Sequence, residues 1–261
     1  MSLTLSTVDL ASLAGERHGH FARLGEAPEL HLELMLLAAS AYRVGWKGVP
    51  AGYCLQGEDG LLVEFELERH LWPDKSELFG SLSDQLALQG ARCFSFDSLL
   101  LGLGVKRGWS ATVEGPLFRD LADDRGPDPT EHAGLRLRPA TIADFSVIAP
   151  HREGVFDDDD QCREWILRDR VSVLGRDGQF LGIGLLTRVW NTRTEHDVGV
   201  MVHPDHRGRG YASFILRTLK RRCLDRGWRP TAGCSTENVA SSRVLHRAGF
   251  VSRHSLIRFD R

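Results

Sequence analysis

One stretch of fifteen residues constrains the fold more than any other part of the sequence: Val198-Gly-Val-Met-Val-His-Pro-Asp-His-Arg-Gly-Arg-Gly-Tyr-Ala212. The pattern of residues 197–202 predicts a β-strand, and residues 211–226 carry apolar side chains at helical spacing. Two glycines, Gly208 and Gly210, stand between them and allow the backbone to turn so that successive N–H groups point one way. A strand that enters a helix through such a turn predicts an α/β domain with an anion-binding turn before the helix.

The rest of the second half alternates strand and helix in the same manner. Gly227 and Gly249 follow apolar helical patterns and predict helix ends. An Arg-Asp-Gly turn at 176–178 predicts a hairpin, and Thr141 with Asp144 forms a capping-box pattern. The predicted strands are 135–138, 171–174, 180–189, 197–202, 231–235 and 250–259, and the predicted helices begin at Thr141 and cover 162–167, 211–226 and 240–248. This order predicts a mixed α/β sheet.

The first half contains a weaker copy of this order. Strands are predicted at 50–55 and 61–67, and a helix over 76–88 that stops at Gly90. The interval from Phe65 to Gly90 equals that from Val202 to Gly227, and Arg107-Gly108-Trp109 echoes Ala248-Gly249-Phe250. We infer an internal duplication, with a chance match of two α/β domains as the alternative.

The clearest boundary is the segment 123–132, which is polar and holds two prolines and a glycine without apolar periodicity. It predicts a linker between two domains, 1–130 and 131–261. The stretch 68–75 occupies the place of the glycine turn in the first domain, but it has no glycine and contains Pro73. The first domain is therefore expected to be a degenerate copy without an anion-binding turn.

Composition excludes several classes of protein. The hydrophobic share is 42%, the charged share 26% and the net charge −2, which is typical of a soluble globular protein and unlike one that coats nucleic acid. The N-terminus has no signal-peptide pattern, and no apolar run is long enough to span a membrane. Five cysteines without a CxxC pair favour reduced thiols over disulfides or zinc. We expect a cytoplasmic protein, a monomer or homodimer, with no metal, nucleic-acid or membrane partner.

The glycine turn fits a longer pattern, Arg207-x-x-Gly210-x-Ala212 preceded by Val202-x-Pro204. This pattern resembles the acyl-CoA signature of the GCN5-related N-acetyltransferase (GNAT) superfamily. The stretch Asn238-x-x-Ser241-x-x-Val-Leu-x-x-x-Gly249-Phe250 resembles the second signature of the same superfamily. The Walker and GxGxxG patterns are absent from this turn, and a purely structural tight turn is the alternative.

The resemblance implies a mixed, mainly antiparallel sheet flanked by helices, in which the fourth and fifth strands separate and hold acetyl-CoA between them. The strand would contribute backbone groups to the pantetheine arm and to the thioester carbonyl, and the turn would hold the pyrophosphate. The implied acetyl-CoA-binding residues are Val200, Met201, Val202, Arg207, Gly208, Arg209, Gly210, Tyr211, Ala212, Asn238 and Ser241. Helix capping is the alternative role for Asn238 and Ser241.

The resemblance also implies direct attack of an amine on the thioester, so the enzyme needs a base and no protein nucleophile. The candidate catalytic residues are Glu195, His196 and Asp197, and a solvated hairpin end is the alternative. His196 shares strand parity with Val200 and is expected to face the cofactor cleft. Many members carry a tyrosine acid at the position that Leu245 occupies here, so the acid is another group, water or absent, and Ser235 and Cys234 are the candidate groups.

These features predict an N-acetyltransferase that moves an acetyl group from acetyl-CoA to the amine of a small molecule. Acetylation of a protein amine and a non-catalytic acyl-CoA-binding module remain alternatives. The acids at 157–160 would attract a cationic acceptor or would complement a helix N-terminus.

Overall fold

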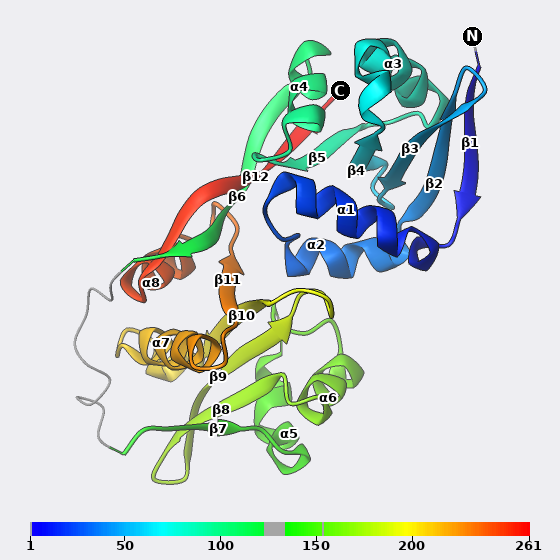
Figure 1. Cartoon of the computed structure of the whole chain (residues 1–261). Coiled ribbons are helices and arrows are strands. Elements are labelled where there is room, and N and C mark those ends of the chain that lie inside the picture. Colours follow the sequence, from blue (N-terminus) through cyan, green and yellow to red (C-terminus); the bar gives the residue numbers. More distant parts are fainter. Residues whose placement is uncertain (1, 123–133, 153) are drawn as a thin grey trace. The chain divides into compact units, whose positions relative to one another are not determined.

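The structure, a computed structural model, describes residues 2–122, 134–152 and 154–261. It contains two compact units (Figure 1). The N-terminal unit comprises Met1–Pro116 with His254–Arg261, and the C-terminal unit comprises Leu117–Arg253. Each unit has a mainly antiparallel sheet flanked by helices, which confirms the predicted fold class. The predicted linker at 123–132 lies outside the described residues.

The sheet of the N-terminal unit has the strand order β1-β2-β3-β4-β5-β12. Its strands are β1 (Leu3–Val8), β2 (Ser40–Trp46), β3 (Val49–Gln56), β4 (Leu61–Leu67), β5 (Gly90–Phe94) and the C-terminal part of β12 (Phe250–Asp260). The strands from β1 to β4 pair antiparallel, as do β5 and β12. Only β4 and β5 pair in parallel, and their register covers Leu61↔Gly90 and Leu62↔Ala91.

Helices cover both faces of this sheet (Figure 1). They are α1 (Ala14–Leu24), α2 (Leu30–Met35), α3 (Lys75–Gln85) and α4 (Ser98–Lys106), with short 3-10 helices at Leu10–Leu13, Leu36–Ala38 and Arg69–Asp74. Phe65 and Leu67 of β4 belong to the apolar core shared with α3 and α4. Because side chains alternate along a strand, Glu64 and Glu66 face the other way, and both contact α1.

The sheet of the C-terminal unit has the order β6-β11-β10-β9-β8-β7. Its strands are the end of β6 (Ser110–Leu121), β7 (Arg136–Pro139), β8 (Val171–Arg176), β9 (Gln179–Arg188), β10 (Glu195–Val202) and β11 (Arg229–Gly233). The β8–β9 turn has positive φ at Asp177 and Gly178, 51° and 80°, as the two-residue hairpin requires.

The helices of the C-terminal unit are α5 (Phe145–Ile148), α6 (Asp159–Leu167), α7 (Tyr211–Leu224) and α8 (Val239–Arg247), with 3-10 helices at Ile142–Asp144, Ala149–His151 and Pro204–His206. The apolar side of α7 packs on β9, β10 and β11, and α5 and α6 lie on the other side of the sheet (Figure 1). The capping box of Thr141 and Asp144 is present. Among the described residues, no helix is both long and apolar enough to cross a membrane.

The repeat predicted in the sequence is real, although one detail used to infer it was wrong. Gly108 and Gly249, with φ of 71° and 82°, each end the last helix of a unit and precede its next strand. Gly90 does not stop a helix as predicted, because α3 already ends at Gln85 and Gly90 opens β5. The interval from Phe65 to Gly90 therefore ends at the start of a strand, whereas the equal interval from Val202 to Gly227 ends in the turn after α7.

Candidate functional site

The central feature of the C-terminal unit is a fork between two strands. β10 and β11 pair in parallel only from Glu195↔Arg229 to Asp197↔Thr231. After this, β11 pairs with β6, at Ala232↔Phe118, while β10 continues with β9 alone. One edge of β10 beyond Asp197 therefore has no strand partner within the described part of the chain.

Backbone hydrogen bonds show which groups point into the fork. The N–H of His203 donates to the Leu181 carbonyl at 2.9 Å, so the odd-numbered residues of β10 bond to β9. Because backbone groups alternate sides along a strand, the N–H and C=O groups of Val198, Val200 and Val202 point into the fork. The fork thus offers backbone donors and acceptors to an extended ligand, whereas the N–H of Met201 is directed toward β9.

A glycine turn and a helix N-terminus follow the fork. Gly208 and Gly210 have φ of 77° and 81°, a region that favours glycine. Gly210 is the N-cap of α7 and provides no side-chain hydrogen bond, so no capping side chain occupies the first N–H groups of the helix. Tyr211 is buried in the core, which anchors this turn, and Ala212 is half-buried.

Two arginines add positive charge to the turn. Arg207 and Arg209 are exposed, and they hold the turn by donating to backbone carbonyls, Arg207 Nε to Val202 at 3.3 Å and Arg209 to Asp205 at 3.3 Å. Uncapped N–H groups, the partial positive charge of the helix end and two guanidinium groups together suit a phosphate-bearing ligand.

The structure separates the three candidate bases. Glu195 is buried, and its carboxylate forms an ion pair with Arg193 at 2.9 Å and lies 3.8 Å from Arg229. Burial opposes the effect, but the hydrogen bond from Arg193 prevails and lowers the pKa of Glu195. A carboxylate held in this way is a weak base and an effective brace for the strand pair.

His196 lies on the α7 side of β10, where its ring stacks on Trp228 with centroids 3.9 Å apart. Its Nδ1 lies 2.9 Å from the Thr194 carbonyl, an acceptor, so Nδ1 carries the proton and Nε2 keeps its lone pair. Burial lowers the pKa of His196 and keeps the imidazole neutral. Asp197 is half-buried, and its side chain faces away from α7 because side chains alternate along β10. Its backbone lies opposite Thr187 of β9 in the strand register, where the fork begins.

The residues of the second signature lie at the start of α8. Asn238 is the N-cap of this helix, and its side chain accepts the Ser241 N–H at 3.0 Å, so Asn238 has the capping contact. Leu245 is 3% exposed and belongs to the core. His246, one residue further on, is exposed and stands edge-on to Phe118 at 5.1 Å.

The acidic run before α6 is held by its neighbours. Asp158 caps the helix by accepting from the Gln161 N–H at 2.7 Å. Asp159 pairs with Arg152 at 3.1 Å and Asp160 with Arg163 at 3.0 Å. These contacts favour the helix-complementing role over attraction of a cationic acceptor.

No group of three or more metal-binding side chains occurs in the described ranges. All five cysteines are free thiols, and four of them are buried. Burial accounts for these four, since free cysteine behaves as a small buried hydrophobe.

Two family matches cover most of the chain. Residues 138–250 match the family described as Acetyltransferase (GNAT) family, and residues 11–121 match the one described as Acetyltransferase (GNAT) domain. No curated protein matches the chain significantly.

Solved structures are similar over the whole length at low sequence identity. A GNAT-family acetyltransferase from Colwellia psychrerythraea has 17% identity and a TM-score of 0.83 over 98% of this chain and 99% of its own. A GCN5-related N-acetyltransferase from Sphaerobacter thermophilus has 15% identity and a TM-score of 0.64, over 99% and 95%. A tandem GNAT protein from the clavulanic acid biosynthesis pathway has 14% identity and a TM-score of 0.61, over 99% and 98%. These similarities show that the fold is shared.

Proposed function

Because the chain belongs to the GNAT acetyltransferase superfamily and carries two of its domains in tandem, we propose that its C-terminal unit transfers an acetyl group from acetyl-CoA to the amine of a small molecule. Membership in this superfamily supports an acyltransferase, and the proposal concerns the identity of the acyl donor and of the acceptor. The observation that carries it is the fork of β10 and β11, which leads directly into the uncapped N-terminus of α7.

In this proposal the ligand follows the fork into the turn. The pyrophosphate of acetyl-CoA accepts hydrogen bonds from the first N–H groups of α7, beside Arg207 and Arg209. The pantetheine arm bonds to the backbone of Val198 and Val202. The N–H of Val200 donates to the thioester oxygen and stabilises the negative charge that develops there. Val200 suits this role better than Met201, whose N–H is directed toward β9.

The chemistry is a direct transfer. The lone pair of the neutral amine attacks the thioester carbon, a C–N bond forms, and the C–S bond breaks with the electron pair on the CoA sulfur. The ammonium proton passes to a base, and two groups at the fork suit this role: Nε2 of His196, which is unprotonated, and the carboxylate of Asp197. Leu245 has no proton to give, so the thiolate leaves as an anion or is protonated by water.

The proposed acetyl-CoA site, formed by the fork, the glycine turn and the N-terminus of α7, is tested by titrating acetyl-CoA into the protein by calorimetry. Gly210→Pro removes an N–H and cannot adopt a φ of 81°, so we expect binding to be lost. The matched control is Gly178→Pro, which imposes the same change at a φ of 80° in the β8–β9 turn of the same unit. Gly178→Pro should bind acetyl-CoA as the unchanged protein does, and thermal unfolding verifies that both variants fold. If the unchanged protein does not bind acetyl-CoA, the proposal fails.

Transfer is then tested by release of the CoA thiol in the presence of small amines and of peptides with a free α-amine or lysine. Faster release with small amines supports the proposal. Faster release with peptides identifies a protein acetyltransferase instead, and tight acetyl-CoA binding without release identifies a non-catalytic module. Activity lost in His196→Gln but kept in Asp197→Asn, or the reverse, identifies the base.

A further inference from the structure

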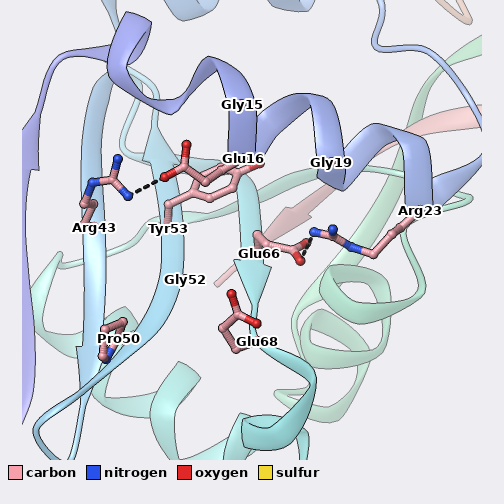
Figure 2. Close-up of a pocket in the computed structure, with 10 residues that line it drawn as sticks. All are labelled: Gly15, Glu16, Gly19, Arg23, Arg43, Pro50, Gly52, Tyr53, Glu66 and Glu68. Carbon is pink, nitrogen blue, oxygen red and sulfur yellow. Dashed lines mark hydrogen bonds and ion pairs between the residues drawn. The ribbon is translucent and has the colours of Figure 1, made fainter.

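A cavity of about 440 Å³ opens in the N-terminal unit between α1 and the strands β2, β3 and β4 (Figure 2). Its wall on the helix side includes Gly15, Gly19 and Arg23, and the strand side includes Glu66 of β4 and Glu68 directly after this strand. Figure 2 shows these side chains gathered around one space beneath α1. The cavity has the size of a small-molecule site, and nothing in the proposed chemistry of the C-terminal unit uses it.

Two helical glycines contribute to this space. Gly15 and Gly19 are four residues apart on α1 and therefore lie on one face of the helix. Each glycine costs a helix about 1 kcal/mol relative to alanine. Packing does not explain Gly15, because a Cβ added there would meet nothing within 4 Å. The absence of side chains at these positions keeps the helix wall of the cavity open.

The lining carries more negative than positive charge. Three carboxylates line the cavity against two guanidinium groups. Glu16 pairs with Arg43, and Glu66 pairs with Arg23 (Figure 2). The carboxylate of Glu68 makes no hydrogen bond or ion pair within the part of the chain that the structure describes. The side chain of Glu68 is exposed, so its carboxylate is accessible to a cation from solution.

Buried ion pairs lie next to two of the residues that line the cavity, Tyr53 and Glu66. Arg17 lies 2.9 Å from Glu64 and 2.6 Å from Glu33, and all three side chains are less than 15% exposed. His20 bonds to Glu66. Burial pulls the pKa of His20 down, but the hydrogen bond to Glu66 and the nearby Glu64 prevail and raise it. The bonds from His20 to Glu66 and from Tyr53 to Glu64 fix the positions of two residues that line the cavity.

We propose that this cavity binds a small primary amine. Its ammonium group lies at Glu68, directly after β4 and two residues from Glu66, and its carbon skeleton runs along the bare helix wall at Gly15 and Gly19. The acids accept hydrogen bonds from the ammonium group, and Arg23 keeps Glu66 oriented toward it. The inference stands apart from acetyl transfer, because every group in it belongs to the N-terminal unit.

Two glycine variants test the site. Gly15→Leu places a side chain in the cavity while improving helix propensity, so the protein should fold and lose amine binding. Gly102→Leu is the matched control: Gly102 is also an exposed glycine inside a helix of the N-terminal unit, an added Cβ there meets nothing within 4 Å, and it is not among the residues that line the cavity. Gly102→Leu should bind amines as the unchanged protein does.

A charge variant and charge-matched probes test the chemistry. The probes are butylamine, 1,4-diaminobutane and phenethylamine, each beside a carboxylate of similar skeleton: valerate, adipate and 3-phenylpropionate. Calorimetry should show binding of at least one amine and weaker or no binding of its carboxylate counterpart. Glu68→Gln should weaken amine binding about tenfold, as expected for the loss of one charged partner.

Acetyl-CoA titrated into the same variants separates the two sites, since Gly15→Leu and Glu68→Gln should leave its affinity unchanged. Equal amine affinity in Gly15→Leu and Gly102→Leu overturns the inference, as does tighter binding of the carboxylates. Failure of all three amines to bind the unchanged protein overturns it as well. A protein that binds amines at the cavity but never binds acetyl-CoA would support this site and contradict the proposed transfer.

Discussion

The two units contain the same strand fork and surround it with different chemistry. β4 and β5 pair in parallel over two residues, as β10 and β11 do over three, before the strands separate. Five residues after the end of β4, the Trp72 indole donates to the Leu67 carbonyl at 3.2 Å, and at the same offset Arg207 donates to Val202 at 3.3 Å. The same backbone position is thus bonded by a neutral ring in one unit and by a cation in the other.

The face of the strand that points away from the apolar core differs as well. Glu64 and Glu66 stand three and one residues before the end of β4, and the corresponding residues of β10 are Gly199 and Met201. Near its end, β4 thus carries two carboxylates on this face, and no glycine turn follows it. The last residues of β10 on this face are uncharged and a glycine turn follows, although Asp197 lies further back on the same face. The two units therefore differ both in the loop after the strand and in the residues of the strand face.

The largest expected effect on ligand binding comes from exchanging the loops. Replacing Arg207-Gly-Arg-Gly210 by the Trp-Pro-Asp-Lys sequence of 72–75 removes two positive charges, two positive-φ positions and an N–H. Acetyl-CoA affinity should fall at least about 100-fold, equivalent to roughly 2.7 kcal/mol, as measured by calorimetry. The reverse exchange should not create binding in the N-terminal unit, because Glu64 and Glu66 lie on the same strand. Strong binding of acetyl-CoA to the N-terminal unit after the reverse exchange would refute the idea that Glu64 and Glu66 prevent binding there.

The next effect tests the buried ion pairs. Arg17→Met leaves the buried carboxylates of Glu33 and Glu64 without their shared guanidinium, so it should destabilise the protein by about 3 kcal/mol. Urea unfolding followed by circular dichroism measures the change. Arg168→Met, which breaks the exposed pair with Glu164, is the control and should cost less than about 0.5 kcal/mol. Equal losses of unfolding free energy in the two variants would show that the buried ion pairs of Arg17 stabilise the protein no more than an exposed pair does.

Removing a helix cap is expected to cause a smaller loss of unfolding free energy. Asn238 caps α8 and Asp97 caps α4, the last helix of each unit. Asn238→Ala should cost about 1 kcal/mol of unfolding free energy, while Asn238→Asp should preserve the cap. If Asn238→Ala also weakens acetyl-CoA binding when Asn238→Asp does not, then Asn238 supports the acetyl-CoA site by capping α8. An unchanged affinity in both variants leaves Asn238 a purely structural residue.

The smallest effect is an opposite response of two histidines to pH. The pKa of His20 is raised, so its stabilising contribution is complete below about pH 6.5 and is lost as the pH rises through the folded-state pKa. Burial lowers the pKa of His196, so folding is disfavoured as the pH falls below about 6.5 toward its folded-state pKa. Unfolding of His20→Gln and His196→Gln, each compared with the unchanged protein from pH 5 to 9, should give differences of opposite slope. Slopes of the same sign would contradict the assigned environments.

Most of the C-terminal unit could be predicted from the sequence. The turn at Gly178, the cap at Thr141 and the helix that starts at Tyr211 are local features, and all three were located correctly. The environment of His196 could not be predicted, because strand parity identifies a face but not the Trp228 ring that covers it. The roles of Glu195, His196 and Asp197 remain predictions.

The cavity of the N-terminal unit was missed, although a signal was present. The alternating run Glu64, Glu66 and Glu68 marks one charged face of a strand whose other face is apolar. Recognising this face required α1, which was not predicted, because the two glycines at 15 and 19 weaken its helical pattern.

The sequence by itself determined the glycine turn and the helix that follows it, because positive φ, capping and periodicity depend on residues a few positions apart. The tertiary structure decided the fork and the buried ion pairs, since these depend on chain segments far apart, such as Arg17 and Glu64, which are 47 residues from each other. It also decided that β6 ends beside β11, at Leu117 and Phe118, and that β12 ends beside β5. A strand's partners follow from the packing of the whole sheet, and no local pattern specifies them.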